Sequence, residues 1–319
     1  IKEIIRETAD AVSILFNVPE ELQSNYSFVA GQYVNLKVTL DGQEIRRAYS
    51  ICSTPESGEV RVAIKAVEKG LFSTYATSEL KTGDTIEISA PEGRFLLNNE
   101  ANKNYIGFAA GSGITPILSM VKTVLSSELS SNFTLIYGNK SVADTIFYKE
   151  LNSLKETYSK RFKLHYIFSR EEVKNELKGR IDQNVTNYFV KNMYKETAFN
   201  AAFLCGPEEM IQQVSSTLEN AKIKKETIHF ELFTASLDES TTKKIQEGIT
   251  EVTILLDDEE TNFTMKQTDD LLSASLRNNL DAPYSCQGGV CSSCLGKVTK
   301  GKAVMVKNSI LTDSEIEEG

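Results

Sequence analysis

The sequence lacks a long hydrophobic run, a basic excess and a secretion signal, and each absence excludes a class of protein. No apolar run approaches the roughly 18 residues that a membrane span needs, and no signal-peptide pattern is visible. Lys and Arg number 35 against 44 Asp and Glu, giving a net charge of −9. A nucleic-acid partner needs a basic surface for phosphate. We therefore expect neither a membrane nor a nucleic acid as partner.

Cysteine is scarce and unevenly placed. Of five cysteines, three lie within nine positions, namely Cys286, Cys291 and Cys294. An odd, clustered set with no signal peptide is a poor disulfide framework. The pattern favours a metal site in a reducing compartment, and therefore a cytoplasmic protein.

The three cysteines have the C-x4-C-x2-C spacing of plant-type [2Fe–2S] ligation. Gly288 and Gly289 allow the loop to fold inward without Cβ clashes, so that the thiolates converge. No cysteine follows Cys294, and ferredoxins of this kind take a fourth ligand roughly thirty residues later. We therefore expect the fourth cysteine beyond Gly319, with the C-terminus of the domain truncated.

Structural zinc is the alternative to an iron–sulfur cluster, because C-x2-C also suits zinc. Zinc sites usually have a second short ligand pair nearby, and none follows here. His165 and His229 lie far upstream and are more typical of packed strand residues. The iron–sulfur interpretation is therefore the favoured one.

Negative charge is concentrated near the C-terminus. Residues 249–319 hold 12 Asp or Glu against 6 Lys or Arg, a net of −6. This excess indicates either a solvated surface or an acidic face that steers a basic protein partner. Both interpretations stay open.

The length of 319 residues exceeds one hydrophobic core and predicts several domains. Residues 1–99 contain short strands punctuated by glycines, a pattern typical of a small antiparallel β-barrel. Strand and helix patterns then alternate over 100–233, which predicts a doubly wound α/β domain with a parallel sheet. The polar segment 234–248 is a predicted linker, and 249–319 form the last domain.

A glycine turn, Gly111-Ser-Gly113, follows the predicted strand Tyr105–Ala110 and precedes a predicted helix. Such a turn lets the backbone approach a pyrophosphate at a helix N-terminus. Thr115 is the expected N-cap and Pro116 the expected first helical residue. A tight turn that binds nothing is the alternative.

Several short motifs now resemble one family in order. Arg47-Ala-Tyr-Ser50 resembles the R-x-Y-S flavin motif of the ferredoxin–NADP reductase superfamily, and Lys69–Ser73 resembles its G-x-x-S element. Similar matches follow at Pro91–Phe95, Tyr137–Asn139, Cys205–Pro207 and Glu231–Phe233. Together with the cysteine loop, the layout is similar to reductases of the phenylacetyl-CoA epoxidase type and related multicomponent oxygenase reductases. The resemblance implies a β-grasp fold for the ferredoxin domain.

The resemblance implies FAD in the first domain and a nicotinamide dinucleotide in the second. It places the flavin on Arg47, Tyr49, Ser50, Lys65, Gly70, Phe72, Ser73 and Phe233. It places the dinucleotide on Gly111, Gly113, Thr115, Asn139, Ser169, Arg170, Cys205 and Gly206. Ser50 and Cys205 are the expected catalytic residues, at the flavin edge and the nicotinamide ring.

NADPH is expected rather than NADH, because the guanidinium of Arg170 beside Ser169 suits a 2′-phosphate dianion. Glu171 follows directly and leaves NADH open.

A nicotinamide gives two electrons, whereas an iron–sulfur cluster accepts one at a time, so a flavin is needed between them. We expect an enzyme that passes electrons from NADPH through FAD and [2Fe–2S] to a partner oxygenase. The alternatives are an FMN-containing ring-hydroxylating dioxygenase reductase and a non-catalytic iron–sulfur interaction or sensor protein.

Overall fold

The computed structural model describes residues 1–127, 130–233, 248–284, 289–291, 293–306, 308 and 310–319. The chain divides into two compact units, Ile1–Phe233 and Thr234–Gly319. Most of the predicted linker, Cys286 and Gly288 lie outside the described residues. Within the described residues, no helix is both long and apolar enough to cross a membrane.

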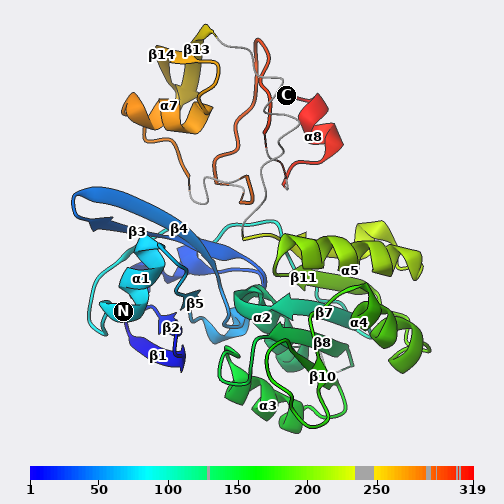
Figure 1. The fold of residues 1–319 in the computed structure, drawn as a ribbon. Coiled ribbons are helices and arrows are strands. Elements are labelled where there is room, and N and C mark those ends of the chain that lie inside the picture. The colour runs from blue at the N-terminus through cyan, green and yellow to red at the C-terminus, as the bar shows by residue number, and fades with distance from the viewer. Residues whose placement is uncertain (128–129, 234–247, 285–288, 292, 307, 309) are drawn as a thin grey trace. The chain divides into compact units, whose positions relative to one another are not determined.

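The first unit opens with two small antiparallel sheets around one apolar core (Figure 1). One sheet has the order β1-β2-β5 and the other β4-β3-β6, and a helix α1 packs against them. The bounds are β1 Glu3–Thr8, β2 Ala11–Leu15, β3 Tyr33–Leu40, β4 Gln43–Ser50, β5 Arg61–Lys65, α1 Leu71–Ser78 and β6 Glu87–Ile88. This arrangement agrees with the predicted antiparallel flavin domain, although the sequence did not predict α1.

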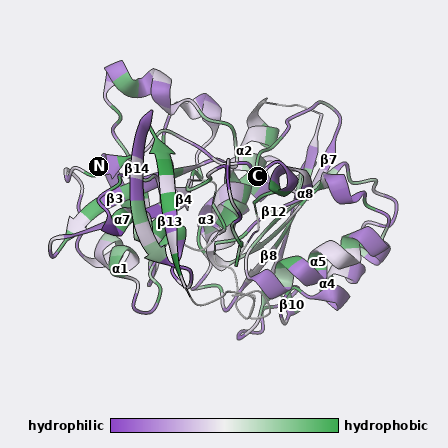
Figure 2. Cartoon of the chain, turned by 90° about the horizontal axis from the view of Figure 1, so that it is seen from above, coloured by the Kyte–Doolittle hydropathy of each residue, from purple (hydrophilic) through white to green (hydrophobic). Residues whose placement is uncertain are grey.

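The second half of this unit is a six-stranded parallel sheet, as predicted, in the order β10-β9-β8-β7-β11-β12. Its strands are β7 Asn104–Ala110, β8 Asn132–Asn139, β9 Phe162–Phe168, β10 Leu177–Lys178, β11 Ala201–Cys205 and β12 Ile228–Glu231. Its helices are α2 Ile114–Ser127, α3 Tyr148–Thr157, α4 Gln183–Asn187 and α5 Glu208–Asn220, and a π-helical turn spans Tyr188–Met193. Figure 2 shows hydrophilic and hydrophobic residues alternating along α5, whose buried side chains face the sheet.

Alternate residues of each strand face opposite layers, because side chains alternate across a strand. Tyr105 and Ala109 of β7 join the core that contains α2, whereas Ile106 and Phe108 are buried but lie on the other face. Alternation buries both faces, as a parallel sheet covered on two sides requires.

The predicted start of α2, with Pro116 as the first helical residue, was wrong by two residues. A 3-10 turn at Gly111–Gly113 leads directly into the helix at Ile114, so Thr115 already lies inside it. The Thr115 hydroxyl donates to the Ser112 carbonyl at 3.0 Å instead of capping the helix end. The Gly111 and Ser112 carbonyls accept the hydrogen bond from the Ile114 N–H, a donor at the helix start that a cap side chain would otherwise satisfy.

Both histidines lie on strands, as expected, but only His165 is half-buried, and His229 is exposed. His165 on β9 shares a 2.6 Å hydrogen bond with the Tyr194 hydroxyl, and burial lowers the pKa of His165 to about 4. His229 on β12 stacks on the Phe203 ring, with centroids 5.3 Å apart. Both rings therefore belong to the packing of the parallel sheet.

The described residues of the second unit form a hairpin and two short helices. Strands β13 (Ile249–Leu256) and β14 (Glu259–Lys266) pair antiparallel. Helix α7 (Leu271–Arg277) is shorter than the predicted 269–280, and its N-cap Asp270 accepts a hydrogen bond from the Ser273 N–H at 2.7 Å. Helix α8 spans Asp313–Glu317 and begins with a capping box at Thr312.

Candidate active site

Three polar side chains from distant parts of the chain meet at the ends of three strands. Ser50 ends β4, Cys205 ends β11 and Glu231 ends β12. The Ser50 hydroxyl donates to Glu231 Oε2 at 3.1 Å, and Cys205 stands opposite Glu231 in the parallel register. Ser50 and Cys205 are the two residues expected from the sequence to be catalytic, and the fold places both beside Glu231.

Burial controls the protonation of this cluster. Desolvation raises the pKa of Glu231 to about 8, although the hydrogen bond from Ser50 opposes the shift. Burial, and to a lesser extent the nearby Glu231 carboxylate, raises the pKa of the Cys205 thiol. At neutral pH the cluster therefore holds a proton on Glu231 and a neutral thiol on Cys205.

Glu231 is the residue that sequence reasoning missed. It was recognised only as part of the Glu231–Phe233 match and was given no role. The signal that could have found it is a carboxylate at the end of the last predicted strand, which follows a strand ending in Cys205. A buried carboxyl group with a raised pKa is a common property of functional sites.

The order of the strands in the parallel sheet reverses next to Cys205. The chain runs outward from β7 through β8 and β9, then returns to place β11 on the other side of β7. Parallel sheets bind ligands at the carboxyl ends of the strands where the order reverses. The Gly111–Gly113 turn and the Cys205–Gly206 step both lie at this switch point.

The two glycines of the turn have different structural reasons. A Cβ on Gly113 would stand 2.1 Å from the Cys205 carbonyl oxygen, so only glycine lets α2 approach the end of β11. Gly111 has φ +55°, and nothing lies within 4 Å of the place of its Cβ. An open, left-handed turn at the start of a 14-residue helix fits a dinucleotide pyrophosphate.

Neighbouring strand ends bring the remaining expected dinucleotide residues together. The Ser169 N–H donates to the Asn139 carbonyl and the Arg170 N–H to the Lys140 carbonyl, both at 2.9 Å. The Arg170 side chain is exposed. The Glu171 carboxylate accepts a 2.7 Å hydrogen bond from the Val142 N–H.

The expected flavin residues gather at the end of β4 and at the start of α1. The Tyr49 and Phe72 rings lie 5.5 Å apart, and Arg47 is exposed. Gly70 is the residue before α1, and the Ser73 hydroxyl donates to the Gly70 carbonyl at 3.3 Å. The G-x-x-S element is thus a helix N-terminus, whose N–H groups fit a phosphate.

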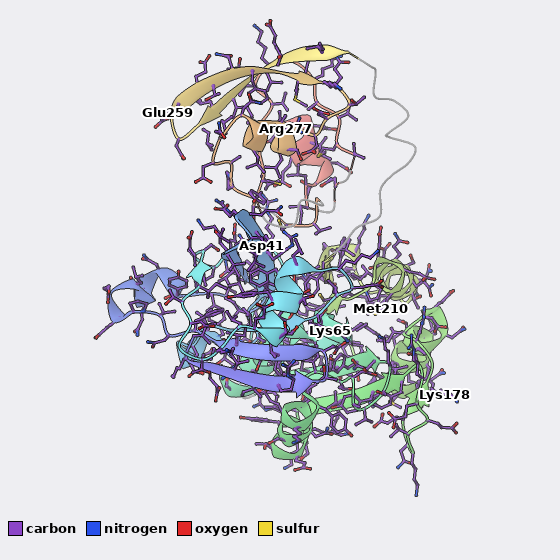
Figure 3. The ribbon with its side chains drawn as sticks, turned by 60° about the vertical axis from the view of Figure 1, so that its left-hand side comes forward. Asp41, Lys65, Lys178, Met210, Glu259 and Arg277 are labelled. Carbon is purple, nitrogen blue, oxygen red and sulfur yellow. The ribbon has the colours of Figure 1, made fainter. Side chains whose placement is uncertain are left out.

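Two further residues expected to bind the flavin, Lys65 and Phe233, lie on other elements than β4 and α1. Lys65 ends β5 (Figure 3), and its ammonium pairs with the Asp10 carboxylate at 3.4 Å, so its side chain is already partnered. Phe233 follows β12 with 40% of its surface exposed, and its ring is available to cover a planar ligand.

The described part of the cysteine loop contains Cys291, which is buried, and Cys294, which is exposed. Gly289 has φ +68°, a conformation that favours glycine and that supports its expected role in turning the loop inward. Two thiols three residues apart on one loop fit cluster ligation. Cys286 lies outside the described residues.

Comparison with known proteins identifies the class. Family models match an oxidoreductase FAD-binding domain at residues 1–96, an oxidoreductase NAD-binding domain at 108–216 and a 2Fe–2S cluster binding domain at 254–319. A subunit of the 1,2-phenylacetyl-CoA epoxidase of Escherichia coli (strain K12) is 38% identical over 324 residues, covering 100% of this chain and 91% of that protein. The chain belongs to the ferredoxin–NADP reductase superfamily, in its branch with a C-terminal [2Fe–2S] domain, and is an oxidoreductase.

Other relatives share the whole layout. The ferredoxin reductase component of 3-ketosteroid-9-alpha-monooxygenase from Rhodococcus rhodochrous is 28% identical over 100% of this chain and 90% of its own. The solved structure of phthalate dioxygenase reductase has a TM-score of 0.65 at 23% identity, covering 99% of this chain and 90% of that one. At that identity the structure supports the three-domain fold.

Proposed function

We propose that this protein is the reductase component of a multicomponent oxygenase, passing electrons from NADPH through FAD and its [2Fe–2S] cluster to a partner oxygenase. The observation that carries the proposal is the Ser50–Glu231–Cys205 cluster beside the Gly111–Gly113 turn, in a chain that also has a cluster-binding domain. The relative at 38% identity is named as part of 1,2-phenylacetyl-CoA epoxidase, and the proposed partner is an oxygenase of that type.

The bound cofactors would supply the redox chemistry, because a flavin accepts two electrons as hydride and passes them on to a cluster one at a time. The residues of this chain bind, orient and hold protons. The Ser50 hydroxyl donates a hydrogen bond to Glu231 Oε2, and this pair would lie at the flavin edge. Below about pH 8 the Glu231 carboxyl group carries a proton, so the pair would hold a proton beside that edge. Buried Cys205 excludes water from the nicotinamide side.

The choice of NADPH is supported by what Glu171 does. A carboxylate that accepts the ribose 2′-hydroxyl is typical of NAD sites, but Glu171 is committed to the Val142 N–H. The exposed Arg170 guanidinium and Lys140 remain beside Ser169 for a 2′-phosphate. Arg170→Ala should raise the KM for NADPH about tenfold or more, the loss expected for one charge-assisted phosphate contact, with the KM for NADH nearly unchanged. Equal effects on both would contradict this choice.

FAD rather than FMN is supported by the helix start at Gly70–Ser73, which offers N–H groups for a second phosphate. Release of the bound flavin and its chromatographic identification test this point. FMN in the released pool would favour the dioxygenase-reductase alternative.

The partner and the compartment follow from charge and redox chemistry. The net charge of −6 over residues 249–319 favours a basic docking face on the oxygenase. Thiolate ligands and a nicotinamide donor both suit a reducing compartment, so we place the protein in the cytoplasm. We also keep 1–99, 100–233 and 249–319 as the proposed domains, joined by the proposed linker 234–248.

One experiment tests the function directly. The anaerobically purified full-length protein should show flavin and iron–sulfur absorbance, and NADPH should bleach both. Iron and acid-labile sulfide measured on the same sample confirm the cluster. Bound flavin that no nicotinamide reduces would overturn the enzyme and favour an interaction or sensor protein. Flavin reduction without any iron would leave a plain flavin–nicotinamide reductase.

A further inference from the structure

We propose that Ser119 and Lys122, both on α2, are positioning residues that hold the flavin-domain segment following Ser50 against the nucleotide-binding sheet. The inference rests on the proposed function, because it concerns how the flavin edge and the nicotinamide site are kept in register for hydride transfer. Neither residue lies in the motifs that identify the family.

The first contact is a buried hydrogen bond between the two domains. The Ser119 hydroxyl donates to the Ser53 carbonyl at 2.6 Å, and the two residues are 0% and 6% exposed. A buried carbonyl oxygen without a hydrogen-bond donor lowers the stability of the fold. The Ser53 carbonyl is therefore held against the Ser119 hydroxyl. Ser53 lies three residues after Ser50 on the same stretch of chain.

The second contact comes one helical turn later. The Lys122 ammonium donates to the Cys52 carbonyl at 3.3 Å and also forms an ion pair with Glu150 of α3. Lys122 is therefore held from two sides: by the flavin domain and by its own domain. Ser119 and Lys122 are three residues apart, which places them on one face of α2.

The segment that they hold is itself fixed in the barrel. The Ser53 hydroxyl donates to the Glu59 carbonyl at 2.6 Å, and the Cys52 N–H donates to the Arg61 carbonyl at 2.8 Å. Ser53 is thus tied to Glu59 and to the start of β5, and Ser50 lies three residues earlier, so a displacement of Ser53 should be passed on to Ser50.

The other end of α2 is fixed at the nicotinamide site. Gly113 precedes the helix and packs against the Cys205 carbonyl, where a Cβ would not fit. Ser119 lies six positions after Gly113, which corresponds to a rise of about 9 Å along a helix. One rigid element thus joins the strand end that carries Cys205 to the segment that follows Ser50.

Apolar packing supports the same arrangement. The main core of the unit combines Cys52 and Phe95 of the flavin domain with Met120 and Val121 of α2. A Cβ on Gly31 would stand 2.7 Å from Met120 Cε and 1.8 Å from the Phe95 carbonyl oxygen. Because the two domains share a core, the polar contacts of α2 have a fixed partner surface on which to act.

Ser119→Ala, which removes only the hydroxyl, tests the proposal on the full-length flavoprotein. We expect the limiting rate constant of flavin reduction at saturating NADPH to fall about 5- to 20-fold, since misplaced reacting atoms slow transfer steeply. The dissociation constant for NADPH and the flavin content should stay near wild type. The primary isotope effect with 4-deuterated NADPH should rise, which a purely structural defect would not cause.

Thr123→Val is the matched control. Thr123 is also buried on α2, and its hydroxyl donates to the Ser119 carbonyl at 2.8 Å, within the helix itself. This variant should keep the wild-type limiting rate constant and isotope effect. Equal rate constants in Ser119→Ala and wild type would overturn the proposal. A reduced amplitude at the wild-type rate constant would also overturn it, because partial unfolding would then explain the loss.

Lys122→Met combined with Glu150→Gln is the second test, because removing Lys122 alone would leave a partly buried carboxylate unpaired. The double variant keeps the aliphatic stem and leaves the net charge unchanged. A slower limiting rate constant with unchanged NADPH affinity supports the proposal, and wild-type kinetics oppose a role for Lys122. If the wild-type flavin were not reduced by any nicotinamide, the proposed function would fail, whereas normal reduction in every variant would sink this inference alone.

Discussion

The two compact units bury very different amounts of apolar surface. Among the described residues of Thr234–Gly319, the buried apolar side chains are Ala274, Tyr284, Val290 and Cys291. Large apolar side chains stay exposed there at Ile249, Leu255, Leu271, Leu295, Val298, Val304, Met305 and Ile316. The unit Ile1–Phe233 instead holds two large cores, which include buried rings such as Tyr137, Phe203 and Phe72.

Among the described residues of the second unit, three of these four buried apolar residues lie in or beside the cysteine loop. A small unit with so little buried apolar surface needs another source of stability, and metal ligation is a common one. From the described residues we therefore predict that packing stabilises the reductase unit, whereas a bound cluster would stabilise the ferredoxin unit.

The sharpest way to break this comparison is Cys291→Ser. Loss of a ligand should remove the cluster and leave residues 249–319 sensitive to protease, because ligand binding and folding are coupled. Flavin reduction by NADPH should change by less than about twofold, since the expected flavin and nicotinamide residues all belong to the other unit, Ile1–Phe233. Iron content, limited proteolysis and stopped-flow absorbance measure the three outcomes. Cys52→Ala is the control that keeps the cluster, and a protease-resistant, iron-free second unit would contradict the comparison.

A paired truncation measures the difference in packing. Leu204→Ala, at a fully buried site in β11, should lower the free energy of unfolding by about 2–5 kcal/mol. Leu255→Ala, at a position 70% exposed in β13, should change it by no more than about 0.5 kcal/mol. Urea denaturation of the two variants beside wild type gives both values. A large loss for Leu255→Ala would mean that the hairpin's outer face is covered.

The buried carboxyl group of Glu231 predicts a pH dependence that belongs to the first unit. The folded protein keeps the Glu231 proton up to about pH 8, whereas an unfolded Glu ionises near its ordinary pKa of 4.5. Between these values the folded state binds more protons, so stability falls as the pH rises. Glu231→Gln should flatten the decline in melting temperature from pH 5 to pH 8, and exposed Glu219→Gln should not. Identical slopes in Glu231→Gln and wild type would contradict the assigned pKa.

The smallest expected effect concerns Tyr137, whose buried hydroxyl donates to the Gly111 carbonyl at 2.9 Å. Tyr137→Phe removes one hydrogen bond to the glycine turn and should raise the KM for NADPH about 2- to 10-fold, the range for one such bond. The matched control is Tyr166→Phe on β9. The Tyr166 hydroxyl accepts a hydrogen bond from Asn152 Nδ2 at 3.2 Å, and Asn152 lies outside the glycine turn. Steady-state kinetics of both variants decide the point, and equal KM values would refute a role in ordering the turn.

Much of this architecture could be predicted from local sequence. The strand-like segments Phe162–Phe168 and Ala201–Cys205 of the sequence correspond to β9 and β11, because largely apolar segments are typical of buried parallel strands. The helical spacing of Met210, Ile211, Val214 and Leu218 likewise corresponds to the buried face of α5. Helix α1 was missed, because a glycine-led segment of eight residues has too few turns for a helical period to be visible.

By itself the sequence determined the periodicities, the glycine turn and the cysteine spacing, since each depends on residues close together in the chain. Only the tertiary structure decided which distant groups meet. It placed Ser50 against Glu231 across 181 positions and turned Glu171 toward Val142. It also joined Ser119 to Ser53. Hydrogen bonds and desolvation depend on distance in space, and no local pattern encodes the strand order that sets it.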